Sequence, residues 1–480
     1  MMASLIGDAI KYLNNLIWIP IYFLLLGLGI YFSLKTNFLQ IRKFFFMLKT
    51  TFGTVLEKNR RKTTGSFTPL QAIATSLAST IGTGNIVGVA VAITEGGPGS
   101  IFWMWFMALF GMIIKYSEII LALKFRERNH EGEWCGGPMY YINNGLKNHW
   151  LALVFSGAMI FVSFTTGNLI QVNSIANIVG DFFVLPEVRI FEGYYLSLTK
   201  IIIGVLLAIT MSMVVLGGMK FIGKITEKLV PFMSVFYILG SILVLAVNYK
   251  SVSDAFLDIF HEAFKIKSVF AGTVGYGISR AFYSGISRGV CSSEAGIGTS
   301  SIAQAASNLK QPVEQALYGI LDVFISSFFI CTLTALVILT GGIYDKSIYA
   351  KALLTEANGL KVNNLSEGVV LSAQSFAKVM GTNFSKIFIM ICVLCFALST
   401  LIGYFYYGSK AYEFIFKEKY HTIYKLLVVA VVAVGPIIEV KIVWLLSDFF
   451  NGLIAIPNLI CLMFLSKVIL NETKKYFSHE

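Results

Sequence analysis

The chain has 480 residues, of which 56% are hydrophobic and 13% are charged, and its formal net charge is +12. This composition is typical of a membrane protein with many spans and excludes a soluble globular protein. The positive charge does not indicate nucleic-acid binding, because the Lys and Arg residues gather in short loops between apolar segments, where they orient a membrane protein.

The apolar segments predict the number of membrane spans. A helix that crosses a hydrocarbon core of about 30 Å needs about 20 apolar residues, and eleven segments meet that requirement. They lie at approximately 16–34, 67–93, 99–123, 151–179, 199–217, 228–248, 270–304, 313–341, 386–414, 424–442 and 444–468. We therefore predict an all-α polytopic protein of the lipid bilayer with about 11 transmembrane helices.

The basic residues predict the orientation of the chain. The loop after the first span is rich in Lys and Arg, whereas the next loop, TEGGPGS, contains neither. Since basic loops stay on the cytoplasmic side, the first loop is cytoplasmic. An odd number of spans then places the N-terminus outside the cell and the C-terminus in the cytoplasm. The expected location is the plasma (inner) membrane.

The second span is interrupted near its middle by Thr80-Ile81-Gly82-Thr83-Gly84-Asn85. Backbone polar groups must be hydrogen bonded in lipid, so a break of this kind is tolerated only where it lines a polar site. The N–H groups at the start of a half-helix can hold a carboxylate, and the carbonyls at the end of the preceding half-helix can hold a cation. The alternative is a helix-packing seam of small residues, formed by Gly84 and Gly88.

A second break, GVCSSEAGIGTSS at residues 289–301, favours the binding site over the packing seam. It falls five spans after the first, so the two broken helices run in opposite directions. This is the pattern of an inverted repeat with a transport site near the middle of the membrane. The predicted parts are an accessory helix and basic loop (1–66), two five-helix repeats (67–250 and 251–470) and a cytoplasmic tail (471–480).

Polar side chains inside other spans are further candidates for the site. Gln171 places an amide near the middle of the fourth span, where interhelical hydrogen bonding is the alternative role. Ser399 and Thr400 are adjacent hydroxyls in the ninth span. Oxygen ligands of this kind suit Na⁺, although such hydroxyls often bond to their own helix.

Charged residues within spans are functional candidates by default. Glu118 follows Lys115 by three residues, which predicts a pair on one helical face. Asp322, Glu294 and Asp448 have no such partner in their own helices. Because Arg288 belongs to the same broken segment as Glu294, an internal ion pair or gate is the corresponding hypothesis.

Several motifs together resemble the alanine/glycine:cation symporter family over nearly the whole chain. They are SLASTIGTGNIVGVAVAITEGGPGSIFWMWFMALFGMIIKYSE, GGPMYYI, GNLIQVNS, ISRGVCSSEAGIG and CTLTALVILTGG. The resemblance implies a LeuT-type 5+5 inverted repeat after one extra helix, and Na⁺-coupled uptake of a small neutral amino acid such as alanine or glycine. It also implies that the carbonyls of Ala78 and Ile81 and the hydroxyls of Ser399 and Thr400 bind Na⁺.

Three departures from the family pattern, at Cys291, Ser293 and Tyr404, concern the substrate. Cys291-Ser292-Ser293-Glu294 stands where the family has Phe-Ser-Asn-Glu, and Tyr404 stands where it has Trp. A different neutral amino acid, such as glutamine or serine, is therefore the alternative substrate. The predicted substrate-binding residues are Thr83, Gly84, Asn85, Gln171, Cys291, Ser292, Ser293, Thr400 and Tyr404.

The sequence contains no Walker A motif, so an ion gradient is the expected driving force of a transporter that is not an enzyme. A cation channel and a non-transporting amino-acid sensor are the rival functions. No filter-like repeat supports a channel. The sequence does not indicate the oligomeric state.

Overall fold

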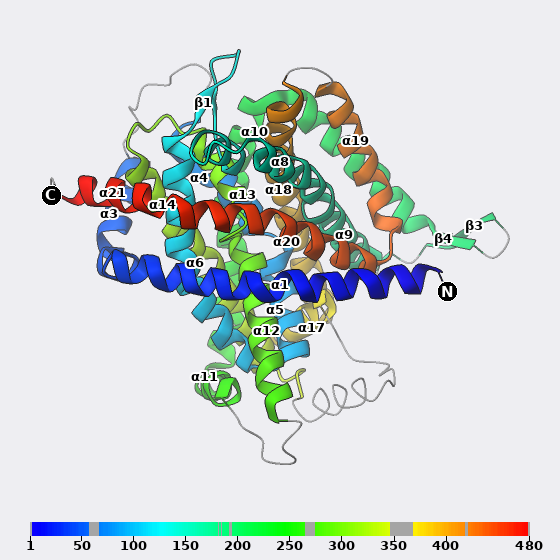
Figure 1. The fold of residues 1–480 in the computed structure, drawn as a ribbon. Coiled ribbons are helices and arrows are strands. Elements are labelled where there is room, and N and C mark those ends of the chain that lie inside the picture. The colour runs from blue at the N-terminus through cyan, green and yellow to red at the C-terminus, as the bar shows by residue number, and fades with distance from the viewer. Residues whose placement is uncertain are drawn as a thin grey trace.

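The computed structural model describes residues 2–56, 67–180, 182–183, 185–191, 194–264, 274–345, 368–417 and 421–478. In this part the chain is almost entirely helical (Figure 1). The helices are α1 (Met2–Lys35), α2 (Leu39–Arg42), α3 (Phe44–Leu56), α4 (Pro69–Thr80), α5 (Val87–Gly96), α6 (Gly99–Lys124), α7 (Pro138–Asn144), α8 (His149–Val162), α9 (Ile170–Gly180), α10 (Leu198–Val247), α11 (Tyr249–Phe264), α12 (Val274–Ser293), α13 (Thr299–Ala305), α14 (Pro312–Val323), α15 (Cys331–Thr340), α17 (Gly368–Met380), α18 (Thr382–Phe416), α19 (His421–Val434), α20 (Val440–Phe464) and α21 (Ser466–Phe477).

Eight helical stretches in the described residues are long and apolar enough to cross a membrane, and a ninth span results if α4 and α5 are counted as one bent helix. The number of about 11 spans stays a prediction. The expected span 270–304 lies partly outside the described residues, and the apolar stretch His421–Ile437 is shorter than the eight. The eight are Tyr12–Lys35, Gly99–Lys124, His149–Gly180, Leu198–Gly218, Phe221–Val247, Pro312–Thr340, Thr382–Phe416 and Ile442–Phe464.

The first helix packs on the outside of the bundle. Helix α1 lies beside α20 and also contacts α6, and the pair α1 and α20 crosses the front of the view in Figure 1. The start of α1 and the last helix, α21, lie on opposite sides of the molecule in this view. The accessory role of this helix stays a prediction.

Two short antiparallel hairpins correct the all-α prediction. Strands β1 (Glu127–Arg128) and β2 (Trp134–Cys135) pair after α6, and β3 (Glu187–Phe191) pairs with β4 (Tyr194–Ser197) before α10. Both hairpins lie between apolar helices. They were missed because strands of two to five residues are too short for periodicity to identify.

Both predicted breaks are present. Helix α4 starts at a capping box formed by Thr68 and Gln71 and ends at Thr80. The 3₁₀ turn η1 (Thr83–Asn85) leads into α5, and the stretch Thr83–Gly96 is bent by 57° from α4. Helix α12 ends at Ser293 and α13 begins at Thr299. The connection between α12 and α13 needs left-handed backbone at Gly296 and Gly298, which glycine adopts without a steric penalty.

Two other helices are locally widened. Residues Ser163–Leu169 (η2), between α8 and α9, and Phe324–Ile330 (η3), between α14 and α15, form π-helical turns. Such turns shift the helical register and often occur at functional sites. The periodicity of the sequence does not reveal them.

Candidate functional site

A cavity with an empty volume of about 330 Å³, counting its mouth, lies between the two breaks. The first break, the second break, η2, α18 and α20 all contribute to its wall. The lining residues are Ser79, Thr80, Gly82, Thr83, Gly84, Thr166, Ile170, Gln171, Cys291, Glu294, Thr400, Tyr404 and Trp444.

The backbone of the first break contacts helix α18. The N–H of Gly82 donates to Asn85 Oδ1 at 3.2 Å, and the carbonyl of Ala78 accepts a hydrogen bond from Thr400 Oγ1 at 3.2 Å. A Cβ on Gly82 would lie 2.5 Å from Thr400 Oγ1, so only glycine allows this approach. The contact places a carbonyl and a hydroxyl oxygen together, as a hard cation requires.

The other two predicted cation ligands, Ser399 and Ile81, form hydrogen bonds within their own helices. Ser399 Oγ donates to the Phe396 carbonyl of its own helix at 2.8 Å. The N–H of Ile81 donates to the Leu77 carbonyl at 2.8 Å, which ends the helical bonding of α4. Both residues are fully buried next to the break.

Side chains brace the start of η1. Thr83 Oγ1 donates to Gln171 Oε1 at 2.8 Å, and Gln171 Nε2 donates to the Thr166 carbonyl at 3.2 Å. The first N–H groups of a helix have no partner within it, and those of Thr83 and Gly84 open η1. The Thr83 side chain is thus already hydrogen bonded, whereas the N–H groups of Thr83 and Gly84 have no partner within the turn.

Three predicted substrate-binding residues do not line the cavity. The Nδ2 of Asn85 donates to the Ser326 carbonyl at 2.9 Å, while its Oδ1 holds Gly82. Ser292 Oγ bonds to Ser327 Oγ at 3.0 Å, and Ser293 Oγ accepts from its neighbouring backbone. These side chains stabilise the breaks, because the unwound backbone needs partners that the helix no longer supplies.

The second break places a carboxylate in the cavity wall. Glu294 adopts a left-handed backbone conformation (φ 55°) directly after α12 and is 1% exposed. Its Oε2 accepts hydrogen bonds from Thr299 Oγ1 at 2.7 Å and from Ser79 Oγ at 3.2 Å. One carboxylate oxygen thus links the two breaks.

The expected pair of Glu118 with Lys115 is wrong. Lys115 Nζ lies 2.8 Å from Asp322 Oδ2 on α14 and also donates to the Ser293 carbonyl at 2.9 Å. Glu118 Oε1 instead accepts from the Gly296 N–H at 2.9 Å and from Asn458 Nδ2 at 2.7 Å. The prediction failed because the spacing of residues along one helix does not show which side chains of neighbouring helices lie closer.

Asp322 also binds the first broken helix. Its oxygens accept hydrogen bonds from Thr80 Oγ1 at 2.7 Å and from Ser76 Oγ. All members of this group are at most 2% exposed. The ion pair of Asp322 with Lys115 therefore ties the end of α4 to the end of α12.

Arg288 does not pair with Glu294, which corrects the proposed internal ion pair. Its Nη2 lies 3.9 Å from Glu95 Oε2 on α5, and its guanidinium lies 4.9 Å from the ring centroid of Trp444. Trp444 belongs to the cavity wall. Asp448 interacts electrostatically with Arg288, and its carbonyl accepts from Trp18 Nε1 at 3.0 Å.

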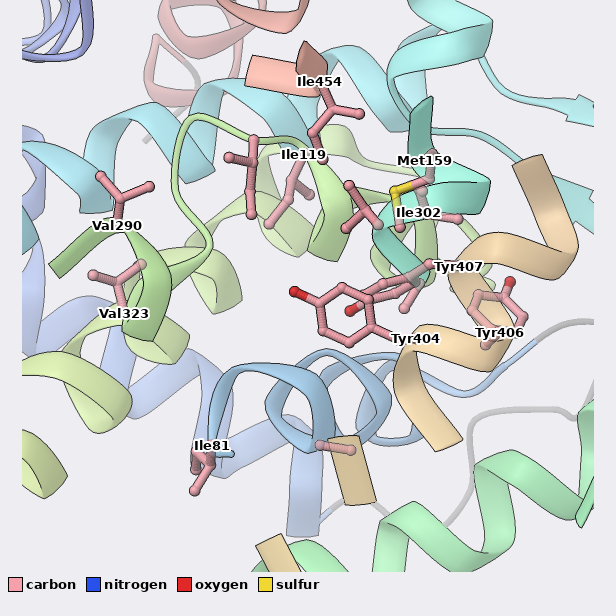
Figure 2. Packing of buried hydrophobic residues seen from close by; sticks show 14 of the residues in the cluster. Ile81, Ile119, Met159, Val290, Ile302, Val323, Tyr404, Tyr406, Tyr407 and Ile454 are labelled. Atoms are coloured by element: carbon pink, nitrogen blue, oxygen red, sulfur yellow. The ribbon is translucent and has the colours of Figure 1, made fainter. Parts of the chain in front are cut away.

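Aromatic residues of α18 form one side of the cavity region. Tyr404 and Tyr407 extend from α18 in the same direction, and their ring centroids are 5.5 Å apart, while Tyr406 points elsewhere (Figure 2). Tyr404 lines the cavity, and the hydroxyl of Tyr407 is hydrogen bonded to Ser79 Oγ at 2.7 Å. Cys291 Sγ faces Gly84, because a Cβ there would lie 4.0 Å away.

Sequence reasoning missed part of the lining. Ser79, Thr80 and Gly82 line the cavity but were not among the predicted site residues, although Thr80 and Gly82 belong to the predicted break and their hydroxyl and glycine content was a usable signal. Thr166 lies in the π-helical turn η2, where Gly167 packs against Tyr404. Trp444 comes from α20, and nothing in its local sequence distinguishes it.

The β1–β2 hairpin holds the far end of α13. Arg126 donates to the carbonyls of Ala305, Ser307 and Leu309 at 2.6 to 3.0 Å, and burial lowers the pKa of its guanidinium to about 10. Glu133 lies 3.4 Å from Lys410 Nζ of α18, and burial raises the pKa of the Glu133 carboxyl. Arg126 stays charged at neutral pH, so its bonds persist there.

Comparison with known proteins gives consistent matches over the whole chain. The family model described as the Sodium:alanine symporter family matches residues 2–480. The sodium/alanine symporter AgcS of Methanococcus maripaludis is 39% identical over 471 residues, which cover 96% of this chain and 95% of that protein. The probable sodium/glutamine symporter GlnT of Bacillus subtilis is 31% identical over 478 residues, covering 99% and 91%. A solved manganese transporter of Eremococcus coleocola is 13% identical, covers 84% of this chain and 78% of its own, and has a TM-score of 0.49.

Proposed function

Because the chain belongs to the sodium:alanine symporter family, we propose that it carries a small neutral amino acid into the cell together with Na⁺ by alternating access. Family membership confirms the resemblance seen in the sequence. The chain is a multi-pass membrane transporter and not an enzyme, and its family implies co-transport of Na⁺.

The cavity between the breaks is the observation that carries this proposal. Thr83 and Gly84 line the cavity, and we propose that their backbone N–H groups hold the carboxylate of the amino acid. The positive end of the half-helix dipole favours this charge. The braced pair of Thr83 and Gln171 keeps the turn in place for that role.

Na⁺ is proposed to bind where the first break meets α18. The Ala78 carbonyl and Thr400 Oγ1 already share a hydrogen bond of 3.2 Å, and Ile81 and Ser399 are the further proposed ligands. Na⁺ would replace the hydroxyl proton as the partner of the Ala78 carbonyl, since both oxygens prefer a hard cation. Each positive charge moved inward across 100 mV gains about 2.3 kcal/mol, which drives accumulation of a net-neutral amino acid.

Alanine or glycine is the proposed substrate, and a polar neutral amino acid such as glutamine or serine is the second candidate. The names of the relatives include both an alanine and a glutamine symporter. Tyr404 and Cys291 give this cavity a hydroxyl and a thiol. These two positions favour the second candidate, because they replace the Trp and Phe of the family pattern.

The remaining architectural predictions form part of the proposal. We propose 11 spans in a LeuT-type 5+5 inverted repeat over 67–250 and 251–470, after the accessory helix α1. The broken helices α4–α5 and α12–α13, one in each half, support it. The basic loops favour a plasma membrane orientation with the N-terminus outside and the C-terminus inside.

Uptake into proteoliposomes tests the proposed function. Labelled alanine should accumulate above the external concentration when Na⁺ is outside, and accumulation should stop when choline replaces Na⁺. Na⁺-independent accumulation contradicts the coupling. Saturable, concentrative uptake separates a symporter from a cation channel, and any measurable flux excludes a non-transporting sensor.

A further inference from the structure

The two oxygens of Glu294 have different environments. Oε2 accepts hydrogen bonds from Ser79 and Thr299. Oε1 is fully buried and has no hydrogen-bond partner among the described residues. Tyr404 also lines the cavity, and its hydroxyl interacts with this carboxylate without a well-formed hydrogen bond to Oε1. The cavity wall therefore holds one carboxylate oxygen, Oε1, that the described residues leave without a well-formed hydrogen bond.

Lys115 interacts electrostatically with Glu294 but forms its direct contacts with other groups. Lys115 Nζ contacts Asp322 Oδ2 at 2.8 Å and donates to the Ser293 carbonyl at 2.9 Å. Asp322 receives two further hydroxyl donors, from Ser76 and Thr80. Lys115 and Asp322 thus balance each other, and no described contact supplies Glu294 with a positive charge of its own.

A buried carboxylate without a cation is costly, and a ligand that brings a cation removes the cost. The carboxylate of an amino acid avoids Glu294, because like charges repel, and binds the donors of η1 instead. The ammonium group of an α-amino acid is bonded to the carbon next to the carboxylate, and it can donate three hydrogen bonds. We infer that Glu294 Oε1 accepts a hydrogen bond from the ammonium of the substrate, so that the site requires an α-amino acid zwitterion. This inference rests on the proposed function.

The charges are then balanced in three pairs. Lys115 balances Asp322, the ammonium of the substrate balances Glu294, and Na⁺ balances the carboxylate of the substrate. An inorganic cation at Oε1 is the rival occupant. An inorganic cation is less favoured at this position because Oε1 is a single oxygen atom, and Na⁺ needs several oxygen ligands. The other carboxylate oxygen, Oε2, already accepts hydrogen bonds from two hydroxyl groups.

Glu118 provides a matched control. It is another fully buried carboxylate with one unpartnered oxygen, Oε2, and two donors on Oε1. It does not belong to the residues that line the cavity. A Gln side chain at either position keeps an acceptor oxygen for the existing hydrogen bonds and removes the charge.

The test measures binding of alanine and of propionate, which lacks the ammonium, to the purified wild type and to Glu294→Gln and Glu118→Gln in saturating Na⁺. Glu294→Gln should weaken alanine binding by about 30-fold, the expected effect of a lost hydrogen bond to a charged group. Weak propionate binding should stay unchanged, so the selectivity ratio falls. Glu118→Gln should keep the wild-type ratio.

Three results would overturn the inference. An unchanged ratio in Glu294→Gln removes the ammonium contact, and a shift in the Na⁺ concentration for half-maximal binding instead of the alanine affinity assigns Oε1 to a cation. If Glu294→Gln does not fold, protection of wild-type Glu294 from a hydrophobic carbodiimide decides. Alanine should protect and propionate should not, and equal protection contradicts the inference. Wild-type protein that binds no neutral amino acid refutes the proposed function itself, whereas Na⁺-driven alanine uptake with an unchanged ratio refutes only this inference.

Discussion

The two broken helices stabilise their unwound backbone by different means. At the first break, neutral side chains contact the backbone: Asn85 Oδ1 accepts from the Gly82 N–H, and Thr400 Oγ1 donates to the Ala78 carbonyl. At the second break, ionisable side chains contact the backbone in addition to the neutral Asn458. Lys115 donates to the Ser293 carbonyl, and Glu118 accepts from the Gly296 N–H.

This difference indicates that the two breaks have different roles. A neutral break leaves its backbone N–H and C=O groups to respond to charges that arrive and leave, such as a carboxylate and Na⁺. A break held by fixed charges is already neutralised and rigid, because a buried ion pair with satisfied hydrogen bonds is costly to separate. We therefore expect substitutions in the backbone contacts of the first break to change transport, and substitutions of the ion pair Lys115–Asp322 at the second break to change stability.

The largest expected effect is on stability, at the ion pair of the second break. Lys115→Met leaves Asp322 charged and unpaired in the protein interior, which should cost about 3–5 kcal/mol of folding free energy. The double variant Lys115→Met/Asp322→Leu removes both charges and should recover much of this loss. Thermal unfolding in detergent, followed by fluorescence-detected size exclusion, measures both. A double variant as unstable as the single one would contradict an ion-pair role.

At the first break, the contact of Gly82 with Thr400 is the most sensitive point. Gly82→Ala puts a methyl group 2.5 Å from Thr400 Oγ1 and should cost about 1–3 kcal/mol at the site, so Na⁺-driven uptake should fall by up to about 100-fold. Gly88→Ala is the control, since no other atom lies within 4 Å of its added Cβ. Normal uptake by Gly82→Ala would show that the first break can relax.

The positions of the breaks were predictable from the sequence, but their partners were not. Glycine and hydroxyl residues inside an apolar segment located α4 ending at Thr80 and α12 ending at Ser293 to within a few residues. The pair of Lys115 and Asp322 was not predictable, because a long-range contact depends on which helices pack together. For the same reason Asn85 was expected in the site, although its amide is used to hold the break.

The proposed Na⁺ ligand at Thr400 allows a smaller and more specific test. Thr400→Val keeps the shape and removes Oγ1, so the Na⁺ concentration for half-maximal uptake should rise about tenfold, equivalent to about 1.4 kcal/mol. Thr400→Ser retains the oxygen and should stay near the wild-type value. Uptake kinetics at varied Na⁺ and saturating amino acid give both numbers. Equal behaviour of the two variants would remove Thr400 from the cation site.

The smallest expected effect is a pH dependence at the hairpin that anchors α13, the half-helix after the second break. Burial raises the pKa of the Glu133 carboxyl above its ordinary value of 4.5. A raised carboxyl pKa contributes stability that is complete below 4.5 and is lost as the pH rises through the folded-state pKa. Glu133→Gln has no such loss, so its melting temperature should rise relative to the wild type between pH 4.5 and 7. Lys410 keeps its contact with Glu413 at 2.8 Å in this variant. A difference in melting temperature that does not vary with pH would mean that the Glu133 carboxyl titrates alike in the folded and unfolded chain, which would contradict the prediction.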